Sequence, residues 1–167
     1  MNLIAAADEA WGIGKDGGLL AHLPGDMKYF RETTQGKVVV MGRKTLESFP
    51  GGRPLKNRTN IVLTRNGAYQ PEGVRVCRSR EEALEALKEF PPEDVFVIGG
   101  GEIYRELLPY CSRAYVTHIF RDFKADTFLP DLDSDPDWRL SSTGERREDG
   151  GISYEFRVYE RCAGFAQ

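Results

Sequence analysis

The sequence predicts a single α/β domain, with a mainly parallel central sheet, an antiparallel C-terminal edge and flanking helices. Strand-length apolar runs alternate with helical patterns over most of the chain, which is typical of α/β domains. Two more strand patterns then follow without a helix between them, which favours an antiparallel edge. The 167 residues contain no repeat and no linker. We therefore expect one domain over residues 1–161 and a frayed tail over 162–167.

The composition is that of an ordinary globular protein and argues against several classes of function. With 40% hydrophobic and 29% charged residues, the chain can bury a normal core. A net charge of −3 gives no reason to expect nucleic acid or an anionic membrane as a partner. No apolar run reaches transmembrane length, and the N-terminus lacks the pattern of a signal peptide. Since no extended hydrophobic repeat is present, we expect a monomer.

The cysteines and histidines indicate a reducing cytoplasm and no metal site. Cys77, Cys111 and Cys162 are odd in number, far apart and outside any C-x-x-C motif, so no disulfide framework is expected. Two histidines are too few for a His-rich metal centre. We expect both His22 and His118 to point away from any reacting group.

The first elements are a buried strand over 2–7 and a glycine-rich connection over 8–23. Four glycines in one connection favour a mobile lid, although a loose hairpin with ordinary turn glycines is the alternative. Pro24 then suits the first position of a helix that runs to about Gln35, with Gly36 beyond its end.

Asp26 falls in the first turn of that helix and shares a face with Phe30, with Met27 beside them. A carboxylate among apolar side chains must be neutralised or paired with a group that enters from outside. The simpler alternative is that Asp26 only complements the helix dipole. We expect burial to outweigh the helix N-terminus and to raise the pKa of Asp26.

Three clusters that suit phosphate groups follow predicted strands. The strand over 37–41 leads into Gly42–Thr45 and a short helix near 44–48, and the strand over 59–64 ends with Thr64 and Arg65. Arg78 closes a short strand over 74–77, ahead of a helix that starts with a capping box and stops before two prolines. The strand over 94–98 opens through Gly99–Gly101 onto a helix over 102–108. Each cluster alone also fits solvated cations or a tight turn.

The last elements are a strand over 114–120, a polar connection over 121–136, and strands over 138–143 and 152–160 that form an antiparallel hairpin across a charged turn. Ligands of open α/β sheets bind beyond the carboxyl ends of the strands, where the three clusters meet. Two basic sites and one glycine turn suit a phosphorylated dinucleotide. The cations beside Thr64 suit a 2′-phosphate and therefore favour NADPH over NADH. No acidic residue is evident at the position where an NAD enzyme binds the ribose 2′-hydroxyl, which points the same way.

Eight motifs, in order, make the chain resemble the dihydrofolate reductases from residue 3 to about 160. They are IAAA at 4–7, WGIG at 11–14, L-P-x-D-M-x-x-F at 23–30, VMGRKT at 40–45, GRPL at 52–55, NRTNIVLTR at 57–65, VIGGG at 97–101 and YVTHI at 115–119.

The resemblance implies NADPH-dependent reduction of 7,8-dihydrofolate to 5,6,7,8-tetrahydrofolate, a step of one-carbon metabolism and a target of antifolates. Asp26 would contact the pterin and promote protonation of its ring nitrogen, and Thr117 would brace Asp26. The other implied substrate-binding residues are Ile4, Ala5, Met27, Phe30, Phe49, Leu55, Arg58 and Ile98, of which Arg58 would pair with the substrate α-carboxylate.

The resemblance also implies an NADPH site and a cis peptide bond between Gly99 and Gly100. Its implied cofactor-binding residues are Ala6, Ile13, Gly42, Arg43, Lys44, Thr45, Leu63, Thr64, Arg65, Arg78, Ile98, Gly99, Gly100, Gly101, Glu102, Ile103 and Tyr104.

Four positions depart from the family pattern. Leu20 and Ala21 replace a Pro-Trp pair whose Trp commonly holds a water near the acid and covers the pterin. Leu46 replaces a Trp of many members, for which we expect a packing change only. Glu102 replaces a cation of some members, which predicts a slightly weaker hold on the adenosine phosphate.

Two other interpretations remain open on the sequence. One is the NADPH-dependent reductase of a riboflavin-pathway pyrimidine, which is similar in fold and cofactor. The other is a nucleotide-binding module without catalysis, which would keep the phosphate clusters but need no acid in an apolar pocket.

Overall fold

The computed structural model describes residues 1–162, so 163–167 of the expected tail lie outside the described residues. The strands are β1 (Asn2–Ala7), β2 (Gly12–Gly14), β3 (Val38–Gly42), β4 (Thr59–Leu63), β5 (Arg75–Cys77), β6 (Val95–Gly99), β7 (Arg113–Ile119), β8 (Thr127–Phe128), β9 (Trp138–Thr143), β10 (Arg147–Asp149) and β11 (Ile152–Arg161). The helices are α1 (Pro24–Thr34), α2 (Arg43–Glu47), α3 (Arg80–Leu87) and α4 (Gly101–Leu107), with 3-10 turns at Pro50–Gly52, Pro92–Asp94 and Leu108–Tyr110.

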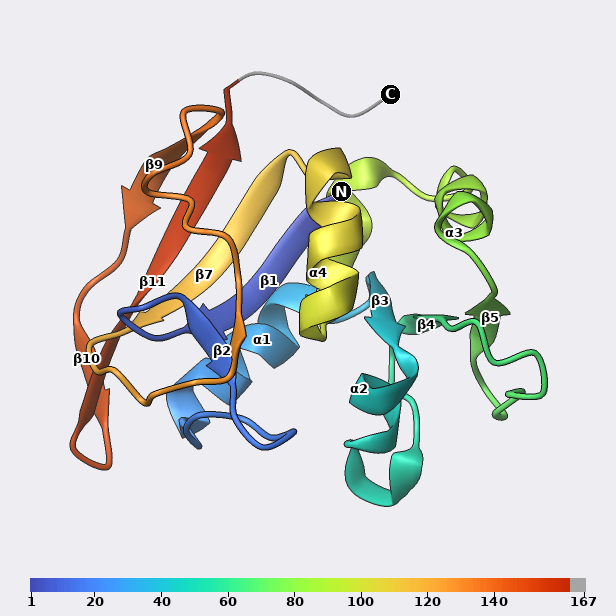
Figure 1. The fold of residues 1–167 in the computed structure, drawn as a ribbon, viewed down its shortest axis with the longest axis horizontal. Helices are drawn as coiled ribbons and strands as arrows, with labels where there is room; N and C mark the ends of the chain where they lie inside the picture. Colours follow the sequence, from blue (N-terminus) through green and yellow to red (C-terminus); the bar gives the residue numbers. More distant parts are fainter. Residues whose placement is uncertain (163–167) are drawn as a thin grey trace.

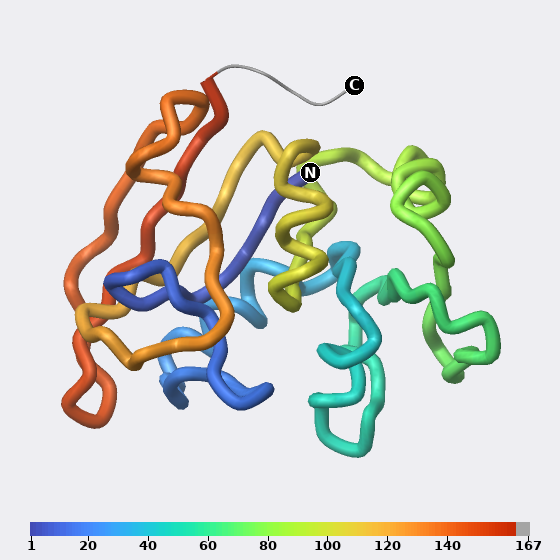
Figure 2. The backbone as a smooth tube through the Cα atoms, viewed as in Figure 1, coloured from blue at the N-terminus to red at the C-terminus, as the bar shows by residue number. Residues whose placement is uncertain are grey.

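One large sheet runs through the molecule in the order β10-β11-β7-β1-β6-β3-β4-β5, with β9 paired to β11 (Figures 1 and 2). Every neighbouring pair in the part of the sheet from β7 to β5 is parallel. β11 is antiparallel to β7 along seven residue pairs. The predicted parallel sheet with an antiparallel C-terminal edge is therefore confirmed.

Side-chain alternation along the central strands builds two layers. On one face, Leu3 of β1, Val40 of β3 and Val97 of β6 are buried against Leu107 of α4 and Ala83 of α3. The other face carries two smaller clusters. One gathers around Met41 and Val39 with Leu46 of α2, and the other joins Leu23, Ile119 and Tyr154. α1 and α4 lie on opposite sides of β1 (Figure 1). Leu46 is fully buried, which agrees with a packing role at this position.

The C-terminal hairpin is more elaborate than the sequence indicated. β9 and β11 pair antiparallel as predicted, but the charged segment between them contains a third strand, β10, which also pairs with β11. Gly150 and Gly151 both have positive φ, at 57° and 82°, and form the two-residue turn that joins β10 to β11. The sequence reading missed β10 because the charged residues of this exposed edge strand hide the alternation.

A second small sheet was also missed. β2 lies inside the glycine-rich connection and β8 inside the polar connection, and the two pair antiparallel. Strands this short carry no readable period. Asp8 is buried and accepts backbone hydrogen bonds from Gly12 at 2.8 Å and Phe123 at 3.0 Å, which ties the two connections together. The connection over 8–23 is therefore anchored at its start, and the lid remains a prediction.

Candidate functional site

Asp26 lies where α1 meets the central strands. Pro24 occupies the start of the helix, as its missing N–H predicts, which puts Asp26 in the first turn. The buried Thr117 of β7 donates its hydroxyl to Asp26 Oδ1 at 2.5 Å. Thr117 stands opposite Ala6 in the β1–β7 ladder, so residues from α1, β1 and β7 converge on one point. The sequence placed Asp26 correctly, and its contact with Thr117 is present.

The pKa of Asp26 is raised above the usual value of an aspartate. Burial is the main cause, the hydrogen bond from Thr117 opposes it, and the nearby charge of Asp149 adds to the rise. The expected direction is confirmed, whereas the part of Asp149 could not be read from the sequence. A carboxyl group with a raised pKa in a cleft is a candidate for proton transfer.

A small pocket of about 50 Å³ has Asp26 among its lining residues. Leu20 and Ala21, two of the four departures from the family pattern, lie in its wall beside Met27. Its remaining lining residues come from β1, the 8–23 connection and β7: Ala6, Ile13, Leu19, Leu23 and Ile119. The volume is enough for about one water molecule.

The apolar residues expected around a substrate lie on two parts of the sheet. Phe49, Leu55 and Ile98 are half-buried against the Met41 cluster, and Met27 is 48% exposed on α1. Phe30 is half-buried on the same helix, and Ile4 is buried in β1. The side chain of Ala5 packs into the core on the α4 side of the sheet. Ala5 can therefore face the Asp26 side only through its backbone.

Arg58 is held in place before any ligand arrives. Its guanidinium donates to Thr34 Oγ1 at 3.1 Å, to the Lys56 carbonyl at 2.8 Å and to the Arg31 carbonyl at 3.2 Å. These bonds join α1 to the segment before β4 and fix the plane of the guanidinium. A fixed planar fork is suited to bind a carboxylate.

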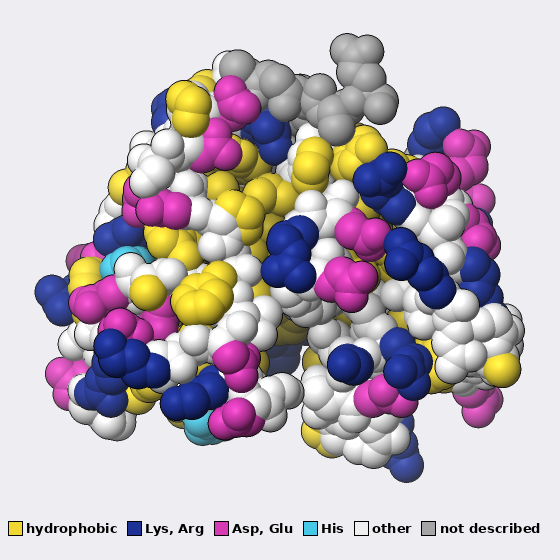
Figure 3. Space-filling view, in the orientation of Figure 1, with side chains coloured by type: hydrophobic (Ala, Val, Ile, Leu, Met, Phe, Trp, Pro, Cys, Tyr) yellow, Lys and Arg dark blue, Asp and Glu magenta, His cyan; other side chains and the backbone are white. Residues whose placement is uncertain are grey.

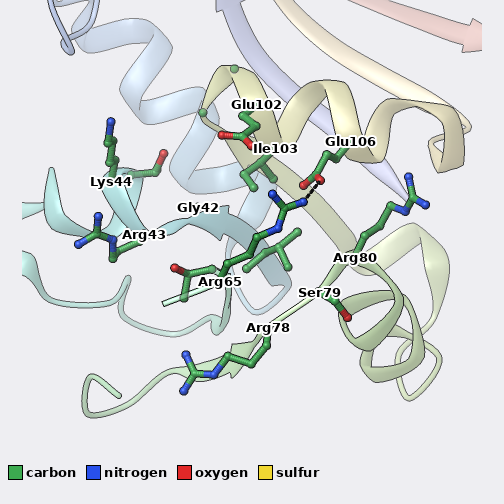
Figure 4. A pocket seen from close by; sticks show the side chains of 15 residues that line it. Gly42, Arg43, Lys44, Arg65, Arg78, Ser79, Arg80, Glu102, Ile103 and Glu106 are labelled. Carbon is green, nitrogen blue, oxygen red and sulfur yellow. Dashed lines mark ion pairs between the residues drawn. The ribbon is translucent and has the colours of Figure 1, made fainter. Parts of the chain in front are cut away.

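A larger cleft of about 460 Å³ opens at the carboxyl ends of β3, β4 and β6. Twelve of the predicted cofactor residues line it: Gly42, Arg43, Lys44, Thr45, Leu63, Thr64, Arg65, Arg78, Gly100, Gly101, Glu102 and Ile103. The peptide bond between Gly99 and Gly100 is cis. The three clusters that the sequence placed at strand ends are thus brought together (Figure 4).

Some predicted cofactor residues lie outside this cleft. Ala6 and Ile13 line the small pocket beside Asp26. Ile98 packs against the Met41 cluster, and Gly99 ends β6. Tyr104 is buried beneath the site, where its hydroxyl donates to the Ile4 carbonyl at 2.8 Å and burial raises its pKa.

The sequence reading missed three lining residues: Ser79, Arg80 and Glu106. Ser79 and Arg80 stand at the start of α3, where Ser79 Oγ accepts the Glu82 N–H at 3.1 Å. The capping box predicted this helix start from the sequence, but it gave no sign that the two residues line the cleft. Glu106 lies one helical turn after Glu102 on α4, and this spacing was a usable signal.

Basic and acidic side chains both line the cleft. Arg65 pairs with Glu106 at 3.6 Å and Arg43 pairs with Glu47 at 3.8 Å. Arg78 donates to the Asn66 carbonyl at 2.7 Å. Figure 4 shows Arg65 extended toward the carboxylate of Glu106, and Figure 3 shows basic and acidic side chains interspersed on this part of the surface. Glu106 therefore competes with an entering anion for Arg65.

Comparison with known proteins decides the family. The family model described as dihydrofolate reductase matches residues 1–161. The chain belongs to the dihydrofolate reductase family. It is 40% identical over 163 residues to the dihydrofolate reductase of Bacillus subtilis (strain 168), covering 96% of this chain and 94% of that one. It is 41% identical over 145 residues to the enzyme of Haemophilus influenzae, covering 87% of each.

A solved dihydrofolate reductase has the same fold. The protein from Enterococcus faecalis, complexed with NADP(H) and RAB-propyl, is 41% identical in sequence and superposes with a TM-score of 0.85. The match covers 97% of this chain and 96% of that one. The predicted family and fold are confirmed over nearly the whole chain.

The structure also bears on metals, cysteines and membranes. In residues 1–162, no group of three or more His, Cys, Asp or Glu side chains is placed to hold a metal ion. Cys77, Cys111 and Cys162 are free thiols. None of the helices within the described chain is long and apolar enough to cross a membrane.

Proposed function

We propose that the chain reduces 7,8-dihydrofolate to 5,6,7,8-tetrahydrofolate with NADPH. The observation that carries this proposal is the Asp26 carboxyl group, held by Thr117 beside an apolar pocket. The basic cleft at the ends of β3, β4 and β6 supports the cofactor assignment. Family membership over residues 1–161 supports the reaction. We also propose that the protein works as a cytoplasmic monomer that binds antifolates.

Each part of the proposed site has its own role in the reduction. Bound NADPH supplies the hydride that reduces the pterin C=N bond. Asp26 binds the pterin and promotes delivery of a proton to the ring nitrogen, and its raised pKa keeps that proton available nearer to neutral pH. Thr117 fixes the orientation of the carboxyl group. Ile4, Phe30 and Phe49 supply part of the apolar surface that excludes water around the reacting bond.

The cleft residues would hold the phosphates of NADPH. The first residues of α2 and α4 line the cleft, so their N–H groups would hold the pyrophosphate, and Gly100 and Gly101 would let it approach the backbone closely. Arg43, Arg65 and Arg78 also line the cleft and would hold the 2′-phosphate, which distinguishes NADPH from NADH.

The test of this function is to mix the purified chain with NADPH and dihydrofolate and to follow the loss of near-ultraviolet absorbance, with NADH as the comparison. NADPH consumption that is fast relative to NADH supports the proposal. NADPH binding without turnover of dihydrofolate would indicate a non-catalytic module. Turnover only of a ribosylamino-pyrimidine would indicate the riboflavin-pathway reaction, which the family match does not favour.

Replacing Arg58 by Lys is expected to raise the KM for dihydrofolate about tenfold and to leave kcat nearly unchanged. Three backbone and side-chain acceptors orient the Arg58 guanidinium for a planar pair with the substrate α-carboxylate. Lysine keeps the positive charge but cannot form this planar pair. Steady-state kinetics with dihydrofolate measure this, and Lys56→Arg is the matched control at an exposed neighbouring position. A fall in kcat with an unchanged KM would place Arg58 outside the substrate site.

Replacing Glu106 by Gln is expected to lower the KM for NADPH roughly threefold. The change frees Arg65 from its ion pair and removes a negative charge from the wall of the phosphate cleft. Glu85→Gln on the outer face of α3, where Glu85 pairs with Lys88, is the control. A weaker hold on NADPH in Glu106→Gln would instead show that Glu106 itself binds the cofactor.

A further inference from the structure

The helix that carries Asp26 has no cap of its own. Its N-cap position is Leu23, which makes no side-chain hydrogen bond and is buried against Ile119 and Tyr154. Helices usually begin with Ser, Thr, Asp or Asn, whose side chain accepts an N–H of the first turn. α1 gives up this arrangement because Leu23 is needed in the core, so its first N–H groups require a partner from elsewhere.

Asp149, at the end of β10, supplies that partner across 124 residues of sequence. Its Oδ2 accepts the Gly25 N–H at 2.8 Å and the Tyr154 hydroxyl at 2.9 Å. Tyr154 is buried, and burial together with the bond to Asp149 raises its pKa to about 12, so it remains a donor over the working pH range. The carboxylate is therefore held at two points next to the turn that contains Asp26.

Gly25, the residue before Asp26, also suits the contact with Asp149 and Tyr154. A Cβ built on Gly25 would collide with the Tyr154 hydroxyl, so the glycine is what lets Tyr154 and Asp149 reach the helix. The glycine turn after Asp149 is tight, and Asp149 pairs directly with Ile152 across it. A second contact joins the same elements, because Tyr29 of α1 stacks on Phe156 of β11 with ring centroids 3.9 Å apart.

We propose that Asp149 is a positioning residue for the reaction, which fixes the first turn of α1, and with it Asp26, from the β10–β11 hairpin. This inference rests on the proposed function of Asp26. Asp149 has no place in the substrate or cofactor residues named above, and it acts through Asp26. Its negative charge also favours the protonated form of Asp26, which is the form that promotes protonation of the pterin.

Asp26 has few other groups around it that could set its proton affinity. The phenols of Tyr29, Tyr104 and Tyr154 stay neutral at the pH of an assay, because desolvation, which is partial for the half-buried Tyr29, raises their pKa values. Asp149 is the charged group that acts on Asp26 within residues 1–162. The ionisable and hydrogen-bonding neighbours, by element, are Tyr29 of α1, Tyr104 of α4, Thr117 of β7, Asp149 of β10 and Tyr154 of β11.

The test compares three full-length variants. Asp149→Asn keeps an oxygen for the Gly25 N–H but removes the charge, and Tyr154→Phe keeps the charge but releases one of its two anchors. Glu148→Gln is the matched control, since it removes the same charge from an exposed neighbouring position of β10 whose side chain points to the other face. The readouts are the pH profile of kcat with NADPH and dihydrofolate, and the titration of the Asp26 carboxyl carbon by NMR in protein labelled with ¹³C-aspartate.

In Asp149→Asn the midpoint of the Asp26 titration is expected to move to lower pH, and kcat on the alkaline side to fall about threefold with KM unchanged. Tyr154→Phe is expected to shift the midpoint less and in the same direction, which keeps the test valid if Asp149→Asn folds poorly. Glu148→Gln is expected to match wild type. An Asp26 titration that is the same in Asp149→Asn and wild type overturns the inference. A wild-type protein without dihydrofolate turnover contradicts the proposed function instead.

Discussion

Replacing Asp26 by Asn is expected to lower kcat for dihydrofolate by about a hundred- to a thousandfold at neutral pH. The reason is that the amide of asparagine cannot give up or take the proton that reduction of the C=N bond requires, and proton transfer by a positioned side chain contributes a rate factor of this size. Asparagine still offers an oxygen to the Thr117 hydroxyl, so the site should keep its shape. Single-turnover kinetics with saturating NADPH measure the loss.

The pH dependence of the same variant separates chemistry from structure. In wild type the rate is expected to fall as pH rises through the raised pKa of Asp26, because the protonated carboxyl group promotes the reaction. Asp26→Asn should have lost this dependence. A profile with the same midpoint in both proteins would assign the titration to another group and contradict the role of Asp26.

The pH dependence of folding stability gives an independent check on the raised pKa of Asp26. Burial raises the folded-state pKa of Asp26 above its unfolded value, so the stabilisation from its protonated form is full below the unfolded pKa and is lost as pH rises through the folded one. Asp26→Asn has no such proton to lose. Wild type should therefore lose melting temperature relative to Asp26→Asn as pH rises through the interval between the unfolded-state and folded-state pKa values.

Replacing Arg43 and Arg65 together by Ala is expected to lower kcat/KM for NADPH by about a hundred- to ten-thousandfold and to change kcat/KM for NADH little. Each guanidinium lines the cleft and can form charge-assisted hydrogen bonds with a 2′-phosphate, worth roughly 1.5–3 kcal/mol apiece. NADH has no such phosphate, so it loses almost nothing. Steady-state kinetics with both cofactors give the ratio.

The controls for this prediction lie outside the cleft. Arg139 and Arg113 both pair with Glu160 on the opposite edge of the sheet, and their double replacement by Ala removes the same charge. That variant should keep the preference for NADPH. If both cofactors lose affinity equally in the Arg43 and Arg65 variant, the two arginines contribute to the general field of the cleft and do not recognise the 2′-phosphate.

Sequence reasoning succeeded where a local pattern has a local physical cause. The apolar runs of β3, β4 and β6 fix the parallel core, and Pro24 fixes where α1 begins and hence where Asp26 stands. The cations and glycines at the strand ends converge because parallel strands bring their carboxyl ends to one edge. These features depend on one segment at a time or on a general rule of sheet topology.

The remaining features depend on contacts between distant segments. β2 and β8 are too short to show a period, and they become strands only by pairing with each other. Asp149 looked like part of a charged turn, and its bond to the Gly25 N–H exists only once the β10–β11 hairpin folds beside α1. Glu106 shows its relation to Arg65 only when α4 and the residues that follow β4 come together at the cleft. Such pairings leave no mark in either segment alone.

The most direct test of the proposed reaction follows the hydride itself. The chain is mixed with dihydrofolate and NADPH that carries deuterium at the transferred position of the nicotinamide, in ordinary water, and the tetrahydrofolate formed is examined by mass spectrometry. Direct transfer within the site around Asp26 predicts that the deuterium appears in tetrahydrofolate and is lost from the cofactor. Tetrahydrofolate without deuterium, or no tetrahydrofolate at all, would contradict the proposal that this site brings NADPH and dihydrofolate together for reduction.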